Sequence, residues 1–253
     1  MNKQTKNHLK IIAECLRYGH ASLFVGAGFS KNAKVLSGMG LPPNWNQLGD
    51  VFYKKARKKE PDDSDRAYAN VLRLAEEVEC VFGRDFLIEV IKKEINDQNL
   101  SPSELHEQLL SLPWKDIFTT NYDSLLEKSI ALLKKKGECA YTTIRKDKEM
   151  GSCFPPFLIK LHGDFSIPKS IVITEEDYRK YPKEHQAMIG HIQHTIMFET
   201  LVLIGFSGND PNFIQWLGWV KDALRDNKRK VYLLTVDEVS DSTIKTFKEK
   251  TLL

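Results

Sequence analysis

The feature of the sequence that most limits its fold is a set of short apolar runs separated by longer stretches with helical periodicity. The runs cover Ala21–Val25, Trp114–Thr119, Phe157–Leu161, Ile171–Ile173, Leu201–Ile204 and Val231–Leu234. Helical patterns lie between or before most of them, over Lys3–Gly19, Tyr122–Leu133, Glu175–Met197 and Pro211–Leu224. Strands that alternate with helices predict an α/β fold, in which helices cover both faces of a parallel sheet.

The region between the first and second runs follows a different pattern. A stretch rich in Gly and Pro, residues 31–46, predicts a loop, and a charged helical pattern follows it from Gln47 to Leu112, with a break at Asp62–Ser64. Ser101 to Glu104 reads as a capping box with Pro102 in the first helical position, opening a helix through Leu110. We therefore predict one domain over residues 1–253, with a helical subdomain inserted at residues 41–113.

Composition excludes several classes of protein. The chain has 253 residues and a net charge of +3, from 37 basic and 34 acidic side chains, which does not favour nucleic-acid or anionic-membrane binding. No run approaches the roughly 18 apolar residues of a membrane helix, and the N-terminus lacks a signal-peptide pattern. The cysteines, at positions 15, 80, 139 and 153, are too far apart for a zinc ribbon. We expect a cytoplasmic protein without a metal.

The first predicted strand runs directly into Gly26, Ala27, Gly28, Phe29 and Ser30. Small residues at such a corner let the backbone approach a phosphate, whose oxygens accept from backbone amides. The corner departs from the dinucleotide fingerprint G-x-G-x-x-G because Lys31 occupies the last glycine position. A glycine-rich strand–helix corner without a ligand is the alternative.

Polar side chains also end the second and third strands of interest. Asn121 and Asp123 follow the run that ends at Thr119, and His162 follows the run that ends at Leu161. The carboxyl ends of parallel strands meet at one edge of the sheet, where ligands bind. Histidine titrates near a pKa of about 6.5 and is a ready general base. The alternatives are that Asn121 or Asp123 caps the next helix and that His162 is a packed core residue.

The fourth strand end repeats the shape of the first. Leu203 and Ile204 lead into Gly205, a hydroxyl at Ser207 follows, and Pro211 opens a helix. Two corners of glycine and hydroxyl residues suit a ligand with two phosphates or two riboses. Asp210 either contributes to this site or caps the helix that follows it.

Taken in order, these four segments resemble the sirtuin fold family, and most closely its bacterial sirtuin-like, NAD-consuming branch of the antiphage-defence type. The resemblance spans about residues 22–234 and includes residues 40–45, which resemble the loop that the family folds over its cofactor. It implies a Rossmann-like domain that binds NAD. Deacylating sirtuins carry two Cys pairs on a zinc module, and this sequence contains no such pair, which argues against deacylation.

The resemblance also implies a role for each matched position. The corner Gly26–Ser30 would hold the diphosphate, Asp123 the nicotinamide carboxamide, and Gly205, Ser207 and Asp210 would lie near the adenosine half. Asn121 and His162 would be the catalytic pair.

The implied reaction is hydrolysis of NAD to nicotinamide and ADP-ribose. Nicotinamide leaves as a neutral molecule, so the site must stabilise positive charge at the ribose C1′. The alternatives are a module that senses NAD or ADP-ribose without turnover, a protein deacylase or ADP-ribosyltransferase, and an oxidoreductase. The resemblance further implies a homo-oligomer, and a partner or additional domain such as an ATPase or an Argonaute-like protein.

Overall fold

The structure is a computed structural model that describes residues 3–36, 40–138, 141–206, 210–224 and 231–235. Its main strands are β1 (Ala21–Val25), β4 (Ile117–Thr119), β5 (Thr142–Ile144), β6 (Phe157–Lys160), β7 (Thr200–Ile204) and β8 (Val231–Leu234). Its helices are α1 (Lys3–Arg17), α2 (Ala27–Ser30), α3 (Trp45–Arg57), α4 (Asp63–Ala67), α5 (Val71–Phe82), α6 (Arg84–Ile95), α7 (Glu104–Ser111), α8 (Leu125–Lys136), α9 (Asp147–Met150), α10 (Glu175–Glu184), α11 (Gln186–Phe198) and α12 (Pro211–Leu224), with 3-10 turns at Asp97–Asn99 and Pro168–Ser170.

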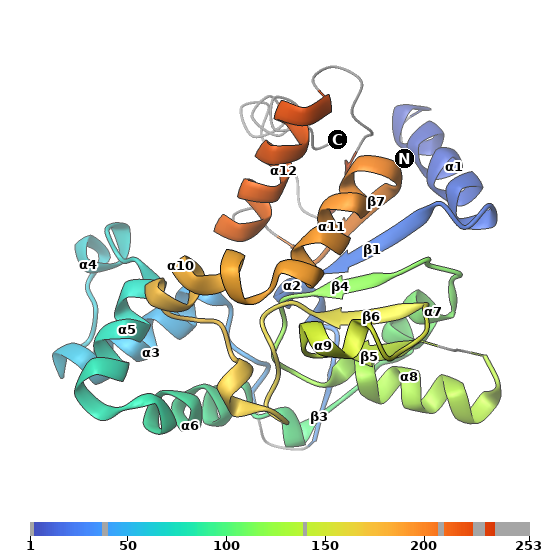
Figure 1. Ribbon diagram of the computed structural model, residues 1–253. Helices are drawn as coiled ribbons and strands as arrows, with labels where there is room; N and C mark the ends of the chain where they lie inside the picture. Colours follow the sequence, from blue (N-terminus) through green and yellow to red (C-terminus); the bar gives the residue numbers. More distant parts are fainter. Residues whose placement is uncertain (1–2, 37–39, 139–140, 207–209, 225–230, 236–253) are drawn as a thin grey trace.

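The six strands form one parallel sheet in the order β5-β6-β4-β1-β7-β8 (Figure 1). Strand β1 is central and pairs with β4 on one side and β7 on the other, so that Val25 lies beside Thr119 and Ile204. The chain therefore places β4, β5 and β6 on one side of β1 and then β7 and β8 on the other. In open α/β sheets, ligands bind at such a point, where the order of the strands changes direction. The predicted α/β class with a helix-covered parallel sheet is confirmed.

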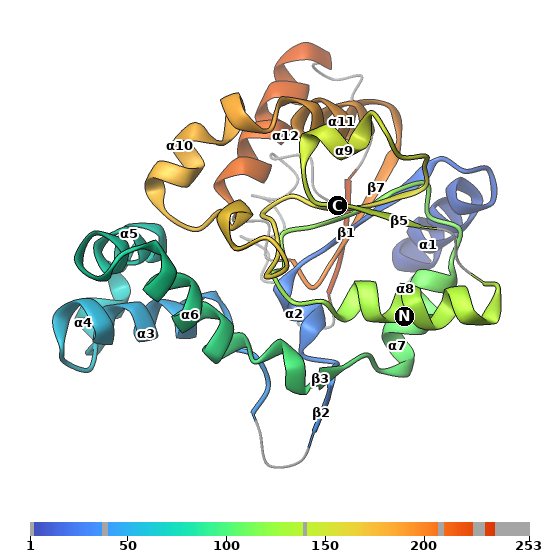
Figure 2. The same ribbon diagram turned by 60° about the horizontal axis from the view of Figure 1, so that its bottom comes forward.

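Alternate residues of each strand enter two different cores. Phe24, Phe118 and Ile159 pack with Trp216 of α12 and with residues of α11 on one face. Leu23, Ile117 and Leu158 join a second cluster on the other face, with contributions from α1, α7 and α8. This alternation follows from the two-residue period of a strand. Figure 2 shows α11 and α12 on one side of the sheet and α7 and α8 on the other.

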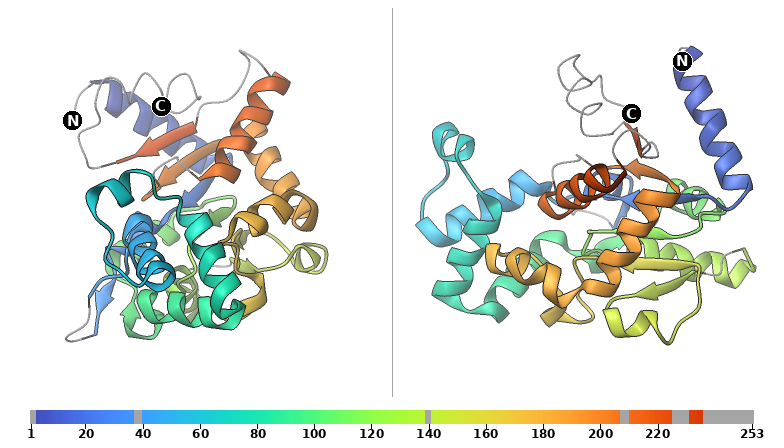
Figure 3. Two further views of the ribbon diagram at one scale, coloured as in Figure 1. Left: turned by 90° about the vertical axis from the view of Figure 1, so that its left-hand side faces the viewer. Right: turned by 45° about the horizontal axis from the view of Figure 1, so that its top comes forward.

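Helices α3, α5 and α6 share a third core, which includes Phe52, Leu74 and Ile91. They lie at the end of the sheet opposite α1 (Figure 3, right). A short antiparallel pair, β2 (Lys34–Val35) and β3 (Leu100–Ser101), joins the chain before this group to the chain after it. Helix α7, by contrast, contributes Leu110 to the second sheet core. That residues 41–113 form one subdomain stays a prediction.

Several local predictions were wrong. Ile171–Ile173 forms no strand among the described residues; its side chains are buried, while the Val172 amide donates to the His162 carbonyl and Arg84 donates to the Ile171 carbonyl. The segment is apolar because its side chains are buried, although its backbone does not pair with a described strand.

Helix boundaries also differ from the predicted ones. The capping residue of α7 is Ser103, whose box is closed by His106, so Pro102 precedes the helix. The pattern predicted as one helix over 175–197 breaks at His185 into α10 and α11. Edge strand β5 was not predicted, because its three residues are mostly half-buried and lack a continuous apolar run.

In the part of the chain that the structure describes, we find no helix with both the length and the apolar character needed to cross a membrane.

Candidate functional site

A cavity of about 740 Å3 lies between the carboxyl ends of the central strands and the helices α3 and α5. In Figure 1 the arrowheads of β1, β4 and β6 point toward the α3–α6 group. We call this space the sheet-edge cavity. Eight of the predicted site residues line it: Ala27, Gly28, Ser30, Asn121, Asp123, His162, Gly205 and Asp210. Its volume falls in the range of about 300–1,000 Å3 typical of small-molecule and cofactor sites.

The remaining predicted residues are placed differently. Gly26 is not a wall of the cavity, and Phe29 turns its ring into the second sheet core, 4.8 Å from the ring of His106. Ser207 lies outside the described residues.

The two glycine corners touch each other through their backbones. The amides of Gly26 and Gly28 donate to the carbonyls of Ile204 and Gly205, at 2.9 and 2.8 Å. A Cβ on Gly26 or Gly28 would come within 2.5 or 2.8 Å of the Gly205 oxygen. The sequence predicts room for a phosphate at these small residues. In the structure they allow the backbone between β1 and α2 to lie close to the backbone at the end of β7.

Asn121, Ser30 and Asp123 form a buried hydrogen-bonded chain at the base of the cavity. The Ser30 hydroxyl donates to Asp123 Oδ2 at 2.7 Å, and Asn121 Nδ2 donates to Ser30 Oγ at 3.1 Å. A hydroxyl has one proton to donate, so Ser30 must accept from Asn121 once it donates to Asp123. Asn121 Oδ1 is buried and has no hydrogen-bond partner among the residues that the structure describes. These hydrogen bonds fix the orientation of the Asn121 side-chain amide. They leave Oδ1 of this cavity-lining residue available to a ligand.

His162 lies at the end of β6 and is 3% exposed. Its Nε2 is 3.4 Å from Asn212 Nδ2 and 3.8 Å from Asp210 Oδ2. Burial lowers the pKa of His162, while the nearby Asp210 carboxylate opposes that shift. Both causes follow from the charge of the imidazolium, which burial disfavours and an anion favours. The lowered pKa keeps His162 neutral, as a general base must be, at pH 7.

Two carboxylates of the site also accept from backbone amides where helices begin. Asp210 Oδ1 accepts from the Phe213 amide at the start of α12, and Asp123 Oδ1 accepts from the Leu125 amide at the start of α8. The capping alternative is therefore correct for Asp210, whereas the N-cap residue of α8 is Ser124 and Asp123 precedes it. Both carboxylate side chains also line the cavity. With both oxygens engaged, by Leu125 and Ser30, Asp123 is held in a fixed orientation.

Lys160 and Glu127 form a buried ion pair next to Asp123, which the sequence did not predict. The Lys160 side chain, fully buried, places Nζ 3.0 Å from Glu127 Oε1 and 2.6 Å from the Asp123 carbonyl oxygen. Burial raises the pKa of Glu127, and Lys160 counters the rise. The pair ties strand β6 to helix α8 directly behind Asn121 and Asp123.

The Gly- and Pro-rich loop also reaches the cavity. Lys31 and residues 42–46 line it, and Asn44 caps α3 through a capping box with Gln47. The position of Trp45, the first residue of α3, agrees with the predicted placement of this loop over the site.

Sequence reasoning missed two residues of the His162 environment. Tyr178 lines the cavity from α10, and its hydroxyl donates to Asp210 Oδ2 at 3.1 Å. Asn212 lies in the first turn of α12. Tyr178 sits inside a helical pattern, and no spacing in the sequence marks it. Asn212 follows the predicted Asp210–Pro211 helix start by one residue, which was the one available signal.

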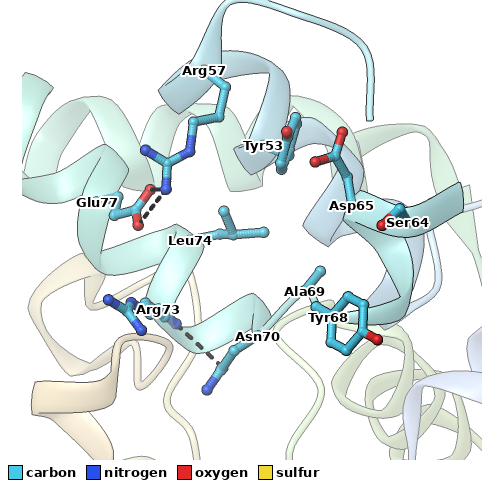
Figure 4. Close-up of a pocket in the computed structure, with 10 residues that line it drawn as sticks. All are labelled: Tyr53, Arg57, Ser64, Asp65, Tyr68, Ala69, Asn70, Arg73, Leu74 and Glu77. Carbon is cyan, nitrogen blue, oxygen red and sulfur yellow. Dashed lines mark hydrogen bonds and ion pairs between the residues drawn. The ribbon is translucent and has the colours of Figure 1, made fainter. Parts of the chain in front are cut away.

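A second hollow, of about 370 Å3, lies among α3, α4 and α5 (Figure 4). Its ionic groups largely neutralise one another: Arg57 pairs with Glu77 at 2.8 Å, and Asp65 pairs with Lys59 at 3.1 Å. Tyr68, at its rim, is 88% exposed. None of the predicted site residues lines this hollow, so the sheet-edge cavity is the candidate site.

Comparison with solved structures supports the fold. One structure, described as "Structural Basis for the Mechanism and Regulation of Sir2 Enzymes", superposes with a TM-score of 0.52 over 96% of this chain and 90% of the other, at 14% identity. At that identity the likeness concerns the fold alone. It confirms the predicted Rossmann-like, sirtuin-type architecture.

Sequence relatives extend the comparison. The NAD(+) hydrolase ThsA of Enterococcus faecium is 28% identical over 89% of this chain and 45% of its own length. The ThsA of Bacillus cereus (strain MSX-D12) is 27% identical over 94% and 48%, and Defense-associated sirtuin 2 of Bacillus subtilis is 24% identical over 90% and 22%. The chain thus spans less than half the length of these relatives. The model of the SIR2-like domain matches residues 115–252, which is more than half of the chain. With the fold and the four strand ends in agreement, the chain belongs to the SIR2-like domain family.

Proposed function

We propose that this chain is an NAD glycohydrolase, which cleaves the bond between nicotinamide and ribose to release nicotinamide and ADP-ribose. One observation carries the proposal: two side chains line the sheet-edge cavity together. They are Asn121, whose oriented amide oxygen accepts from no described residue, and His162, whose imidazole is buried. The names of the ThsA relatives, NAD(+) hydrolase, support the same assignment.

Asn121 is assigned to the charge that develops as the glycosidic bond breaks. The bonding electrons go to the pyridinium nitrogen, so nicotinamide leaves neutral and positive charge develops at C1′. An amide oxygen held in a fixed orientation interacts more strongly with that charge than with the ground state. Because Ser30 and Asp123 already hold the amide, little reorganisation is needed at that moment.

His162 is assigned as the general base. Water adds to C1′, and the proton that it loses passes to the neutral imidazole before it leaves to solvent. The reaction then balances as NAD+ plus water giving nicotinamide, ADP-ribose and one proton. An internal nucleophile in place of water would give a cyclised ADP-ribose.

The remaining cavity residues are assigned to binding. Lys31 and the Ala27–Ser30 corner lie together on the cavity wall, and the cation suits a diphosphate. The amides of Gly26 and Gly28 already serve the two corners, so we assign them to shaping the site. We assign Gly205 and Ser207 to the adenosine half of NAD. We assign Asp123 to the nicotinamide carboxamide, which its carboxylate would bind.

Biological context extends the proposal. One relative is named a defense-associated sirtuin, and we propose that this chain depletes NAD in antiphage defence in the cytoplasm. Residues 41–113 would form an inserted helical subdomain that closes the cavity from above. Because the relatives are more than twice as long, we also propose that the domain works within a larger assembly, as a homo-oligomer or with a partner such as an ATPase or an Argonaute-like protein.

The direct test incubates the purified chain with NAD and follows nicotinamide and ADP-ribose by chromatography. His162→Ala and Asn121→Ala are expected to reduce release at least about a hundredfold while circular dichroism stays unchanged. His194→Ala is the matched control, since His194 is exposed on α11 and lies outside the cavity lining. NAD bound in calorimetry but recovered intact would replace hydrolysis with a sensing role, and acceleration by an acyl-lysine peptide would favour deacylation.

A further inference from the structure

Asp210 connects three elements around His162. Its Oδ1 accepts from the Phe213 amide, which caps α12, and its Oδ2 accepts from the Tyr178 hydroxyl of α10 at 3.1 Å. The same Oδ2 lies 3.8 Å from His162 Nε2 at the end of β6. Both oxygens of Asp210 are therefore directed toward protein groups on α12, α10 and β6.

His162 is enclosed by aromatic side chains. The rings of Tyr178 and Tyr181 form T-shaped contacts with its ring, at centroid distances of 5.3 and 5.8 Å, and Asn212 Nδ2 approaches Nε2 at 3.4 Å. In such surroundings the imidazole exchanges little with water, so neighbouring charges act on it with little screening.

The charged groups facing His162 can be separated. Asp177, which precedes Tyr178 on α10, is paired with Arg84 at 2.9 Å and also accepts from two backbone amides. His185, at the junction of α10 and α11, lies against Tyr181 and 3.4 Å from Asp147. Among the described residues, Asp210 forms no ion pair with a lysine or arginine. It is therefore the carboxylate whose charge acts most directly on His162.

We propose that Asp210 and Tyr178 are positioning residues that set how readily His162 takes up a proton, and that Asp210 does not bind the substrate. Asp210 stabilises the imidazolium that forms when His162 accepts a proton. Tyr178 donates to the same carboxylate oxygen, which holds that oxygen in place and withdraws part of its charge. The proposal rests on the assignment of His162 as the base of the proposed reaction.

The two residues should act on His162 in opposite directions. Asp210→Asn removes the anion but keeps an N-cap side chain, so the pKa of His162 should fall by about one unit. Tyr178→Phe keeps the ring contact but frees the carboxylate, so the pKa of His162 should rise by a smaller amount. A purely structural role for either residue predicts no such opposed pair of shifts.

The first measurement is an NMR titration of the full chain labelled at histidine. The chain has seven histidines, and His162→Ala identifies the signal of interest. Tyr181→Phe is the matched control, because its ring also meets His162 while its hydroxyl donates to Leu161 and not to Asp210. Opposed shifts in the two variants, absent in the control, support the proposal; unchanged titration of His162, or shifts of the same sign, overturn it.

The second measurement separates positioning from binding in the turnover assay. Asp210→Asn should lower kcat about tenfold, move the acidic limb of its pH profile downward, and leave the Kd for NAD unchanged. A large rise in Kd with an unchanged pH profile would make Asp210 a ligand residue and overturn the proposal. The titration does not depend on turnover. Opposed shifts in a chain that binds but does not cleave NAD would leave the charge relationship standing and refute the proposed function alone.

Discussion

Gly28 donates its backbone amide to the carbonyl oxygen of Gly205 across a 2.8 Å hydrogen bond. This contact joins the corner after β1 to the corner after β7. Gly205 has a φ of +61°, and a Cβ at that position would lie 2.2 Å from the Phe29 nitrogen. The junction of the two corners therefore excludes any side chain at position 205.

Gly205→Ala should accordingly destabilise the protein strongly. The positive φ alone costs about 1–2 kcal/mol, and separation of the two corners adds to it, for a total loss of about 3 kcal/mol or more. Gly137→Ala is the control: its φ is +75°, but the added Cβ meets no described residue within 4 Å beyond its chain neighbours. Urea unfolding measures both variants, and equal losses would show that backbone strain, not the close approach, decides the effect.

Ser30→Ala tests the orientation of Asn121. Without the hydroxyl, Asn121 Nδ2 loses its acceptor and Asp123 Oδ2 loses its donor, so the amide is free to turn. We expect kcat for nicotinamide release to fall about tenfold, with a smaller change in KM. Ser111→Ala should change neither, because that exposed hydroxyl donates only to a carbonyl of its own helix. Full activity of Ser30→Ala would exclude the orienting role.

Lys160→Met tests the buried pair behind the site. Removing the cation leaves Glu127 buried without its partner, which typically costs about 3–5 kcal/mol. Glu127→Gln in the same chain should recover part of the loss. Lys136→Met, which breaks an exposed pair with Glu107, should have no measurable effect.

The same variant should show a characteristic pH dependence. Burial raises the pKa of Glu127 in the folded state, and loss of Lys160 removes the largest influence that opposes that rise. A folded-state pKa above the unfolded value stabilises the fold below the unfolded pKa, and this contribution is lost as pH rises through the folded value. The deficit of Lys160→Met should therefore be smallest in acid and grow toward neutral pH. Thermal unfolding between pH 4 and 8 checks the sign; a constant deficit would contradict it.

Trp45→Ala tests whether the loop before α3 contacts the ligand. Trp45 is 42% exposed and lines the cavity, so an aromatic or ribose group of the substrate can pack on its ring. The Kd for NAD should rise about tenfold, with little change in stability. Trp219→Ala is matched in exposure, at 48%, and lies on α12 outside the lining. If both substitutions weaken binding equally, the loop is not a specific contact.

The strand ends were predictable because each carries two signals at once. The runs ending at Val25, Thr119 and Leu161 are apolar enough to be central strands, and each stops at residues of a different chemical kind. The parallel arrangement then places these ends at one edge of the sheet. Eight of the eleven predicted residues accordingly line one cavity.

Other features depend on tertiary contacts that no local pattern records. Lys160 is a charged residue within the apolar run Phe157–Leu161, and a lysine at such a position would be expected to reach solvent. Its burial depends on Glu127 and the Asp123 carbonyl, which come from another part of the chain. Tyr178 acquires its role only because α10 passes beside the start of α12. Ile171–Ile173 has the composition of a strand, but those side chains are buried against neighbouring cores without a ladder partner.

The pairing of β1 with β7 determines how late in synthesis the candidate site can form. Strand β7 begins at Thr200, so β1 stays unpaired on one side until the residues of β7 have left the ribosome. Asp210 and the corner at Gly205 follow β7 in the sequence. They can therefore reach His162 and the corner at Gly28 only after that point. Under the proposed function, a nascent chain that lacks β7 would not yet hydrolyse NAD, and only the folded domain would consume this cofactor.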